Sequence, residues 1–246
     1  MEEESKVEEN TEKVEEKQQP LLKEDKYIKR SIFNSVFLVS IIVIILIAIL
    51  AGIKLFSPPD QADIIQDIIE KGQTEHGYVY NGYVFIEKDN LWHTQRQVGN
   101  NIYNLHFHFS PGHVDQIPVK GSLDKDLDTS IIYITHDPLE ENTSLIALAS
   151  LEANLNLVKG LGARTIPACS KNESKYTDRK NACAKRPIIT CDNTEDAVIF
   201  IKTAETTEIT LNDNCIIIQG KDMELLKAVD KMLYDFYGIT ELNQTN

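Results

Sequence analysis

Residues 31–53 read SIFNSVFLVSIIVIILIAILAGI, a run of 23 positions without a charged side chain. A helix needs about 20 apolar residues to cross the hydrocarbon core of a bilayer, and a helix in lipid satisfies its own backbone hydrogen bonds. The sequence therefore predicts one transmembrane helix over residues 31–56. That helix would separate a tail at residues 1–30 from a folded domain at residues 57–246.

Four basic residues precede the apolar run, at positions 23, 26, 29 and 30, and the first charges after Lys54 are acidic, at positions 60, 63 and 67. Basic residues concentrate on the cytoplasmic side of a membrane span. We therefore expect a single-pass cell-membrane protein with a cytoplasmic N-terminus and an extracytoplasmic C-terminal domain.

A cleaved signal peptide is the alternative, because Ala48 and Ala51 leave room for a cut. Signal peptides place an apolar region of about 7–15 residues behind a short basic start. The longer run here, behind an acidic tail, favours a retained anchor. That tail is rich in Glu, Lys and Gln and buries too little apolar surface to fold. It is either a docking segment for a cytoplasmic protein or a solvated tail without a partner.

All four cysteines lie beyond the apolar run, at Cys169, Cys183, Cys191 and Cys215. None has C-x-x-C spacing, which argues against a zinc ribbon or a thioredoxin-type redox pair. An even number outside the membrane predicts two disulfides with three possible connectivities. We favour Cys169 with Cys183, because the segment between them has the composition of a loop. Four buried free thiols are the alternative.

Three N-x-S/T triplets begin at Asn142, Asn172 and Asn243. Each is a glycan acceptor in a cell that glycosylates exported proteins. Asn142 has a second interpretation as the cap of a helix, and Asn172, inside the expected loop, is the best acceptor.

The domain opens with a helix around residues 64–69 capped by Asp60, followed by three strands at 82–87, 91–97 and 102–109. Aromatic and β-branched residues broken by Asn, Asp and Gly predict antiparallel hairpins. In the third strand Tyr103, Leu105, Phe107 and Phe109 alternate with polar residues, so one face is expected to be buried.

The remainder reads as a strand–helix–strand unit followed by further strands and a last helix. We predict strands at 130–135, 163–168, 187–190, 197–203, 208–211 and 215–219, and helices at 145–158 and 222–237. The first of these helices is apolar nearly all round, so we expect it to be buried against a sheet. The fold class is α+β: an N-terminal antiparallel β-meander joined to a mixed sheet with two packed helices, preceded by one transmembrane helix.

The segment NCIIIQG at residues 214–220, with a following helix that ends in Tyr237-Gly238-Ile239, resembles the end of a group of uncharacterised single-pass, exported archaeal membrane proteins. The stretches at residues 80–83 (YNGY) and 91–92 (LW) are similar to that group too. No activity is attached to the group. The resemblance therefore implies an exported, anchored protein and says nothing about its chemistry.

His106 and His108 are the most suggestive candidates for chemistry. Residues two apart on a strand share a face, and two imidazoles so placed can bind one metal ion such as zinc. A catalytic site needs a third ligand, for which His93, His113 and Asp115 are the neighbours in sequence. The alternative is two solvent-facing histidines without a ligand. His136-Asp137 also follows a strand, and there the turn interpretation is favoured.

A basic loop lies in an otherwise acidic domain. Residues 57–246 carry 17 basic and 28 acidic side chains, so nucleic acid is not an expected partner. The loop could contact an acidic partner, or it could be a solvated loop. Its basic residues are Lys171, Lys175, Arg179, Lys180, Lys185 and Arg186.

These features predict a membrane-anchored interaction or scaffold domain, a subunit of a cell-envelope assembly with a protein partner at the cell surface. No cofactor is expected on this hypothesis, and an enzyme is the less favoured class because no G-x-S-x-G or other catalytic signature is present. The alternative is a metal-dependent extracytoplasmic hydrolase that binds zinc through His106 and His108.

Overall fold

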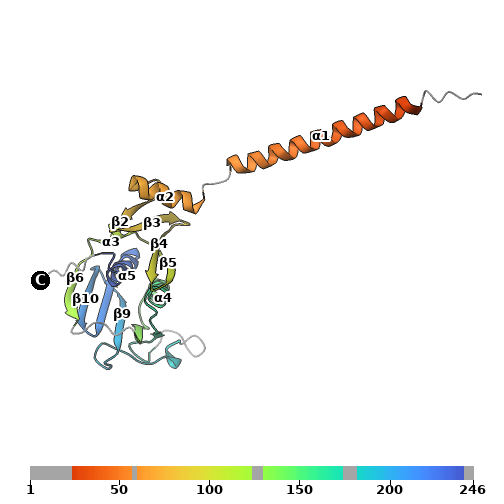
Figure 1. The fold of residues 1–246 in the computed structure, drawn as a ribbon. Coiled ribbons are helices and arrows are strands. Elements are labelled where there is room, and N and C mark those ends of the chain that lie inside the picture. The colour runs from red at the N-terminus through yellow and green to blue at the C-terminus, as the bar shows by residue number, and fades with distance from the viewer. Residues whose placement is uncertain (1–23, 57–59, 124–129, 174–181, 241–246) are drawn as a thin grey trace, which may run out of the picture. The chain divides into compact units, whose positions relative to one another are not determined.

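The computed structural model describes residues 24–56, 60–123, 130–173 and 182–240 of the chain (Figure 1). The chain divides into two compact units, residues 1–59 and residues 60–246. The predicted boundary at residue 57 lies within a few residues of this division. Each unit is described by itself below.

The first unit contains helix α1, Glu24–Phe56, with 33 residues. At about 1.5 Å per residue this helix is long enough for the hydrocarbon core. Its window Val36–Ile53 has a mean hydropathy of 3.4, and none of the window is buried among the described residues. By length and composition α1 can cross a membrane, and the predicted span at residues 31–56 lies inside it.

The second unit begins with α2, Gln61–Lys71, and an antiparallel meander of five strands in chain order. Asp60 occupies the N-cap position, but its side chain makes no capping hydrogen bond; the predicted cap is wrong in that respect. Two short strands that the sequence did not predict precede the three expected hairpin strands. The strands are β1 (Gln73–Thr74), β2 (Gly77–Tyr80), β3 (Tyr83–Lys88), β4 (Leu91–Val98) and β5 (Asn101–Phe107).

A mixed sheet follows, with the order β6-β10-β11-β9-β7-β8. All its pairings are parallel except β10 with β11. The predicted strand at 187–190 is only an isolated bridge between Cys169 and Ile188, and β6 was not predicted. The strands are β6 (Val119–Leu123), β7 (Ile132–His136), β8 (Thr165–Pro167), β9 (Ala197–Thr203), β10 (Glu208–Asp213) and β11 (Cys215–Gly220).

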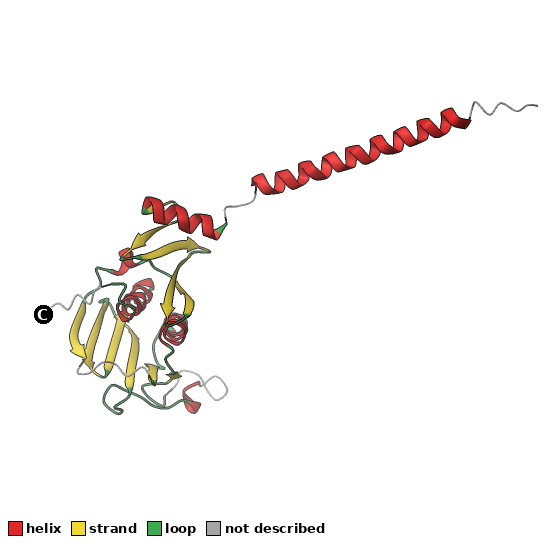
Figure 2. Ribbon diagram, viewed as in Figure 1, coloured by secondary structure: helices red, strands yellow, loops and turns green. Residues whose placement is uncertain are grey.

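Helices α4 (Thr143–Asn156) and α5 (Met223–Phe236) lie between the two sheets (Figure 2). Their apolar side chains join those of both sheets in one core. Tyr234 of α5 contacts two rings of the meander, with centroid distances of 5.7 Å to Phe85 and 4.3 Å to Phe107. The shared core makes this unit one α+β domain, as predicted.

Shorter helical segments complete the domain. They are α3 (Pro111–Val114), the π-helix η1 (Leu157–Leu161) that continues α4, and the 3-10 helix η3 (Ala182–Lys185). Near the end of α5, Lys231 is almost fully buried and its Nζ lies 2.6 Å from the Asp235 carboxylate. Burial raises the pKa of Asp235.

Candidate functional site on helix α4

Helix α4 presents an apolar ridge to solvent. Leu148, Leu151, Leu155 and Val158 are 36%, 52%, 44% and 44% exposed. The opposite face of the same helix, including Ala149 and the other buried positions, packs into the core. The expectation that this helix is buried against a sheet is therefore correct for one face and wrong for the other.

The spacing within the ridge is characteristic of helix–helix contacts. Steps of three, four and three residues separate its members, which is the a/d pattern by which one helix packs against another. Lys159 is the first charged residue after Glu152 on this segment, and the Glu152 side chain is only 4% exposed. The ridge is thus an uncharged apolar surface on an acidic domain.

A small groove of about 120 Å³ runs along this ridge, where α4 meets the meander. The ridge leucines form one wall, and polar groups of β5 and α4 lie at its floor and end. Its lining consists of Leu91, His106, His108, Leu148, Leu151, Glu152, Leu155, Asn156 and Lys159.

Beneath the groove, Glu152 accepts two hydrogen bonds from one residue of the meander. The backbone N–H of His108 donates to Oε1 over 3.0 Å, and His108 Nδ1 lies 2.5 Å from Oε2. The carboxylate raises the pKa of His108. Glu152 therefore fixes both the position and the tautomer of this imidazole, leaving Nε2 free on the groove side.

A second carboxyl group lies behind Glu152. Asp230 of α5 is fully buried, and its Oδ2 accepts the backbone N–H of Phe109 over 2.8 Å. Its Oδ1 is buried without a hydrogen-bond donor, and Glu152 is the neighbouring carboxyl that acts on Asp230. Burial, and next the Glu152 charge, raise the pKa of Asp230. A proton on Asp230, donated to Glu152, satisfies the otherwise unpaired oxygen.

His106 pairs with His93 across the strands β4 and β5. Their Nδ1 atoms are 3.0 Å apart, and His93 Nε2 lies 3.1 Å from the Lys88 carbonyl oxygen. If His93 donates to that carbonyl, its Nδ1 is the acceptor and His106 Nδ1 is the donor. Burial and His93 lower the pKa of His106. In this arrangement His106 keeps an unprotonated Nε2, whereas the raised pKa of His108 favours its protonated form.

The other ligands considered for these histidines lie elsewhere. His113 Nδ1 is 3.0 Å from the Ser110 hydroxyl, and Asp115 accepts the Tyr80 hydroxyl over 2.5 Å. Among the described residues, the one group of three His, Cys, Asp or Glu donors within 4.8 Å is His136 with Cys169 and Cys183, and those cysteines form a disulfide. A three-ligand metal set around His106 is therefore not assembled from the described residues.

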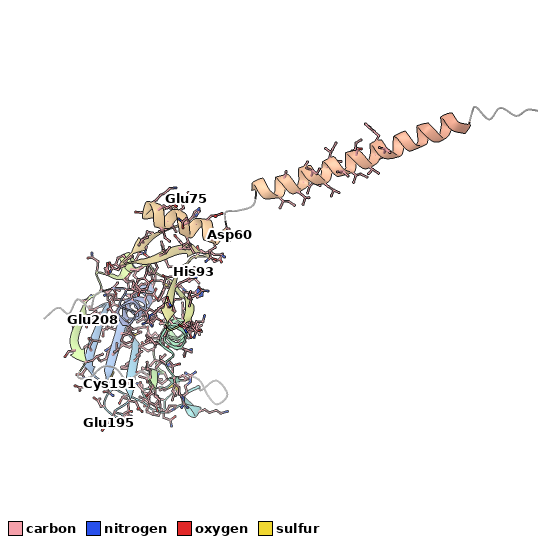
Figure 3. The ribbon with its side chains drawn as sticks, viewed as in Figure 1. Asp60, Glu75, His93, Cys191, Glu195 and Glu208 are labelled. Atoms are coloured by element: carbon pink, nitrogen blue, oxygen red, sulfur yellow. A yellow bond between two sulfur atoms is a disulfide. The ribbon has the colours of Figure 1, made fainter. Side chains whose placement is uncertain are left out.

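The wider surface beside His93 is a shallow groove of about 790 Å³ between α2 and strands β3, β4 and β5. Its lining is part polar and part apolar, with Gln95 hydrogen-bonded to Asn104 across the strands. Figure 3 places His93 on the meander, well separated from Cys191 at the far end of the mixed sheet.

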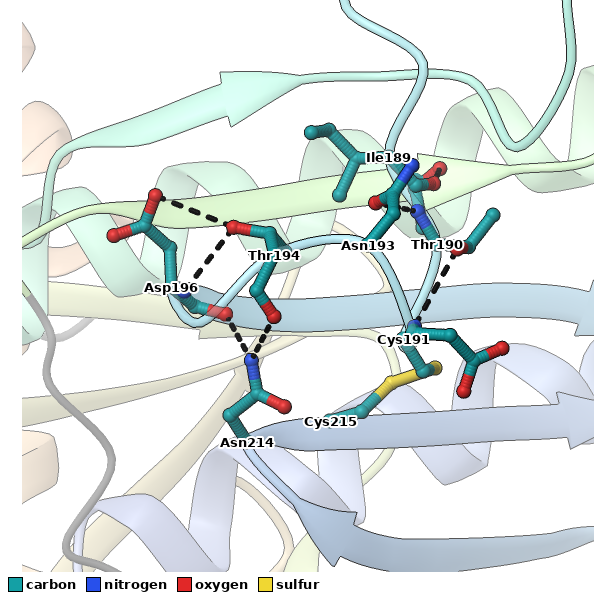
Figure 4. Close-up of a disulfide and its surroundings, with 10 residues drawn as sticks. Ile189, Thr190, Cys191, Asn193, Thr194, Asp196, Asn214 and Cys215 are labelled. Atoms are coloured by element: carbon teal, nitrogen blue, oxygen red, sulfur yellow. Dashed lines mark hydrogen bonds between the residues drawn. A yellow bond between two sulfur atoms is a disulfide. The ribbon is translucent and has the colours of Figure 1, made fainter.

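Two disulfides cross-link the mixed-sheet half. The structure joins Cys169 to Cys183 and Cys191 to Cys215, with Cα–Cα distances of 5.8 and 5.4 Å. Figure 4 shows the second pair and the loop that it holds. In this loop Asn214 Nδ2 donates to the carbonyl oxygens of Thr194 and Asp196. The first pairing is the one favoured from the sequence.

The predicted basic loop is only partly described. Lys175, Arg179 and Lys180 lie outside the described residues. Lys171 forms an ion pair with Asp137 at 2.8 Å, Lys185 is exposed, and Arg186 lines a cavity beside α4. The described members therefore differ in their contacts: Lys171 is paired, whereas Arg186 borders a cavity.

The predicted glycan acceptors differ in their surroundings. Asn142 caps α4, because its side-chain oxygen accepts the Leu145 N–H over 3.2 Å. Asn172 is exposed, and Asn243 lies outside the described residues. Asp137 accepts the backbone N–H of Leu139 over 2.8 Å, which is the turn role that the sequence favoured.

The sequence analysis did not identify Glu152 or Asp230. Each of them is an acidic residue on a mainly apolar face of a helix. Because unpaired carboxyls are rarely fully buried, such a position indicates a carboxyl that has a polar partner in the core. Comparisons with known proteins add no further assignment, because no protein-family model, curated protein or solved structure matches the chain.

Proposed function

We propose that the chain is a membrane-anchored subunit of an extracytoplasmic assembly, and that α4 is its docking helix. The observation that carries the proposal is the exposed ridge of Leu148, Leu151, Leu155 and Val158. A contiguous apolar surface of this kind marks an interaction site more often than chance exposure. Helix α1 supplies the anchor, with the N-terminus cytoplasmic. The two disulfides support an oxidising location for the domain.

The partner proposed is an apolar helix of a different protein, flanked by basic residues. The a/d spacing of the ridge favours a helix as the occupant. The strong negative charge of this domain, 28 acidic against 17 basic side chains, opposes close approach of a second copy. Basic flanks on the partner would instead be attracted.

The test replaces Leu155 with a photo-cross-linking amino acid in the full chain, in its own membranes. Ile69, which is 55% exposed on α2, carries the same group in the control. We expect residue 155, and not residue 69, to cross-link at one stoichiometric protein, with the attachment point inside an apolar helix. Cross-linking at residue 155 to lipid alone, or to a second copy of the chain, contradicts the proposal.

The Leu155→Glu variant provides a loss-of-function readout. Because residue 155 is solvent-exposed, this change should alter the free energy of unfolding by no more than about 0.5 kcal/mol. We expect it to abolish co-purification of the cross-linked partner, whereas Ile69→Glu keeps the partner. Equal recovery with both variants would refute the role of α4.

A specific observation also supports the second candidate, a metal-dependent hydrolase. His106 and His108 both hold a hydrogen-bonding partner at Nδ1 and both line one groove. Outer-shell partners of this kind orient metal-binding imidazoles and leave Nε2 for the ion. Elemental analysis of the purified full chain tests this candidate. A stoichiometric transition metal lost in the His106→Ala/His108→Ala variant supports it, and the absence of such a metal removes it.

A further inference from the structure

A second cavity, of about 530 Å³, lies where α4 meets the carboxyl ends of β7 and β8, and it shares Leu151 with the ridge groove. His136 is the last residue of β7 and Pro167 is the last residue of β8. The two strands are parallel and are joined through α4. Ligands of α/β sheets bind outside the carboxyl ends of such strands, and the volume is within the usual range of about 300–1,000 Å³ for small-molecule sites.

One cation in this cavity has no protein counter-charge. Arg186 lines the cavity, and among the described residues no carboxylate forms an ion pair with it. The two nearest carboxylates that act on His136 have other partners. Asp137 is paired with Lys171, and Glu140 accepts the Thr203 backbone N–H. No acidic residue lines the cavity.

Uncharged polar groups and apolar side chains complete the lining. The polar side chains that line it are Thr143, Ser150 and Asn154, and the Ser150 hydroxyl oxygen itself is buried. Burial and the Arg186 charge lower the pKa of His136, so the imidazole is available as a neutral donor or acceptor. Ile134, Ile146 and Pro167 supply the apolar surface.

We propose that this cavity binds a small organic acid, with its carboxylate on Arg186 and its apolar body against Ile134, Ile146 and Pro167. A planar guanidinium forms two parallel hydrogen bonds with a carboxylate. The cavity shares Leu151 with the ridge groove, but its cation, Arg186, lies outside α4, so ligand binding is tested independently of the docking role.

The test measures binding of 3-(4-fluorophenyl)propionate to the full chain in nanodiscs by fluorine NMR. The matched probe is the corresponding propionamide, which has the same shape and no charge. We expect the acid to bind, the amide to bind at least about tenfold more weakly, and empty nanodiscs to bind neither. A tenfold change corresponds to about 1.4 kcal/mol, which is within the range for one charge-assisted hydrogen bond.

Three variants separate the site from non-specific binding. Arg186→Gln should weaken binding of the acid by about tenfold or more, whereas Arg164→Gln, at an exposed position outside the cavity, should leave it unchanged. Ser150→Ala, which removes a buried hydroxyl that does not reach the ligand, should leave binding unchanged and should not destabilise the free domain. The proposal is overturned if the acid does not bind at millimolar concentration, if acid and amide bind equally, or if the two arginine variants behave alike.

Discussion

From the pairing of the Glu152 and Asp230 carboxyls, we expect two isosteric substitutions to differ in their effect on stability. Glu152 is the acceptor for the backbone N–H and Nδ1 of His108. Gln at position 152 keeps one acceptor oxygen and turns an NH2 group towards the remaining donors. Asp230 is held as the protonated partner by burial. Asn at position 230 reproduces that state, since its oxygen accepts the Phe109 N–H and its NH2 donates to Glu152.

We expect Glu152→Gln to destabilise the domain by about 3 kcal/mol, the cost of leaving buried charged or polar donors without an acceptor. For a domain of this size such a loss lowers Tm by about 6–12 °C. Asp230→Asn should change stability far less at acidic pH. Urea unfolding followed by fluorescence of Trp92, the single tryptophan, which lies on β4 beside Tyr78, measures both. If Asp230→Asn is as damaging as Glu152→Gln, the proton is not on Asp230.

The pH dependence of the Asp230→Asn variant has a definite sign. Because the pKa of Asp230 is raised in the folded protein, the folded state keeps a proton that the unfolded chain releases above its ordinary pKa. Wild-type stability from this group is therefore present at low pH and is lost as pH rises. Asn at position 230 does not titrate. The free energy of unfolding of the variant should therefore rise relative to that of wild type by up to about 1.4 kcal/mol per pH unit above roughly pH 4. A difference that is flat between pH 4 and pH 7 would refute the assignment.

Three further changes test the packing around this site. Gly160→Ala should destabilise the domain by about 1–3 kcal/mol, because a Cβ there would lie 2.5 Å from the Tyr237 hydroxyl oxygen; thermal unfolding measures the loss. Replacing Cys191 and Cys215 together by Ala should cost about 2–5 kcal/mol, and wild type under reducing conditions, which break both disulfides, should lose at least as much. Lys231→Met leaves a buried carboxylate without its cation and should cost about 3–5 kcal/mol at neutral pH. That deficit should shrink at pH 5 because the carboxyl can then be protonated, and a constant deficit would contradict the ion-pair explanation.

The sequence predicts correctly those helices and strands whose apolar residues recur at a regular local spacing. The alternation from Tyr103 to Phe109 correctly identified the buried face of β5, where Leu105 and Phe107 are fully buried. Strand β6 could not be found in this way. This strand, Val119–Leu123, is short and includes Lys, Gly and Ser. It forms because β10, about ninety positions later in the chain, pairs with it.

The site could be predicted only in fragments. His106 and His108 were identified from their spacing on one strand, but their partners, His93 and Glu152, come from another strand and from α4. Periodicity shows that an acidic residue lies on an apolar helix. It does not show that Glu152 and Asp230 meet, because that contact depends on how α4 and α5 pack against β5.

The buried polar groups of α4 also account for the exposure of its leucines. The Asn156 side-chain Nδ2 donates to the backbone carbonyl oxygen of His106. The backbone carbonyl of Asn156 accepts the Tyr237 hydroxyl over 2.6 Å. With Glu152 held by His108, these bonds fix the rotation of the helix about its axis, since turning the leucines inward would break all of them. Burying one leucine fully is worth about 1.5–3 kcal/mol. The ridge residues are already about half buried, so the fold forgoes roughly half of that stabilisation at each position. Polar contacts that hold apolar side chains outward are expected where a partner later covers them, and they support the proposal that α4 is a docking helix.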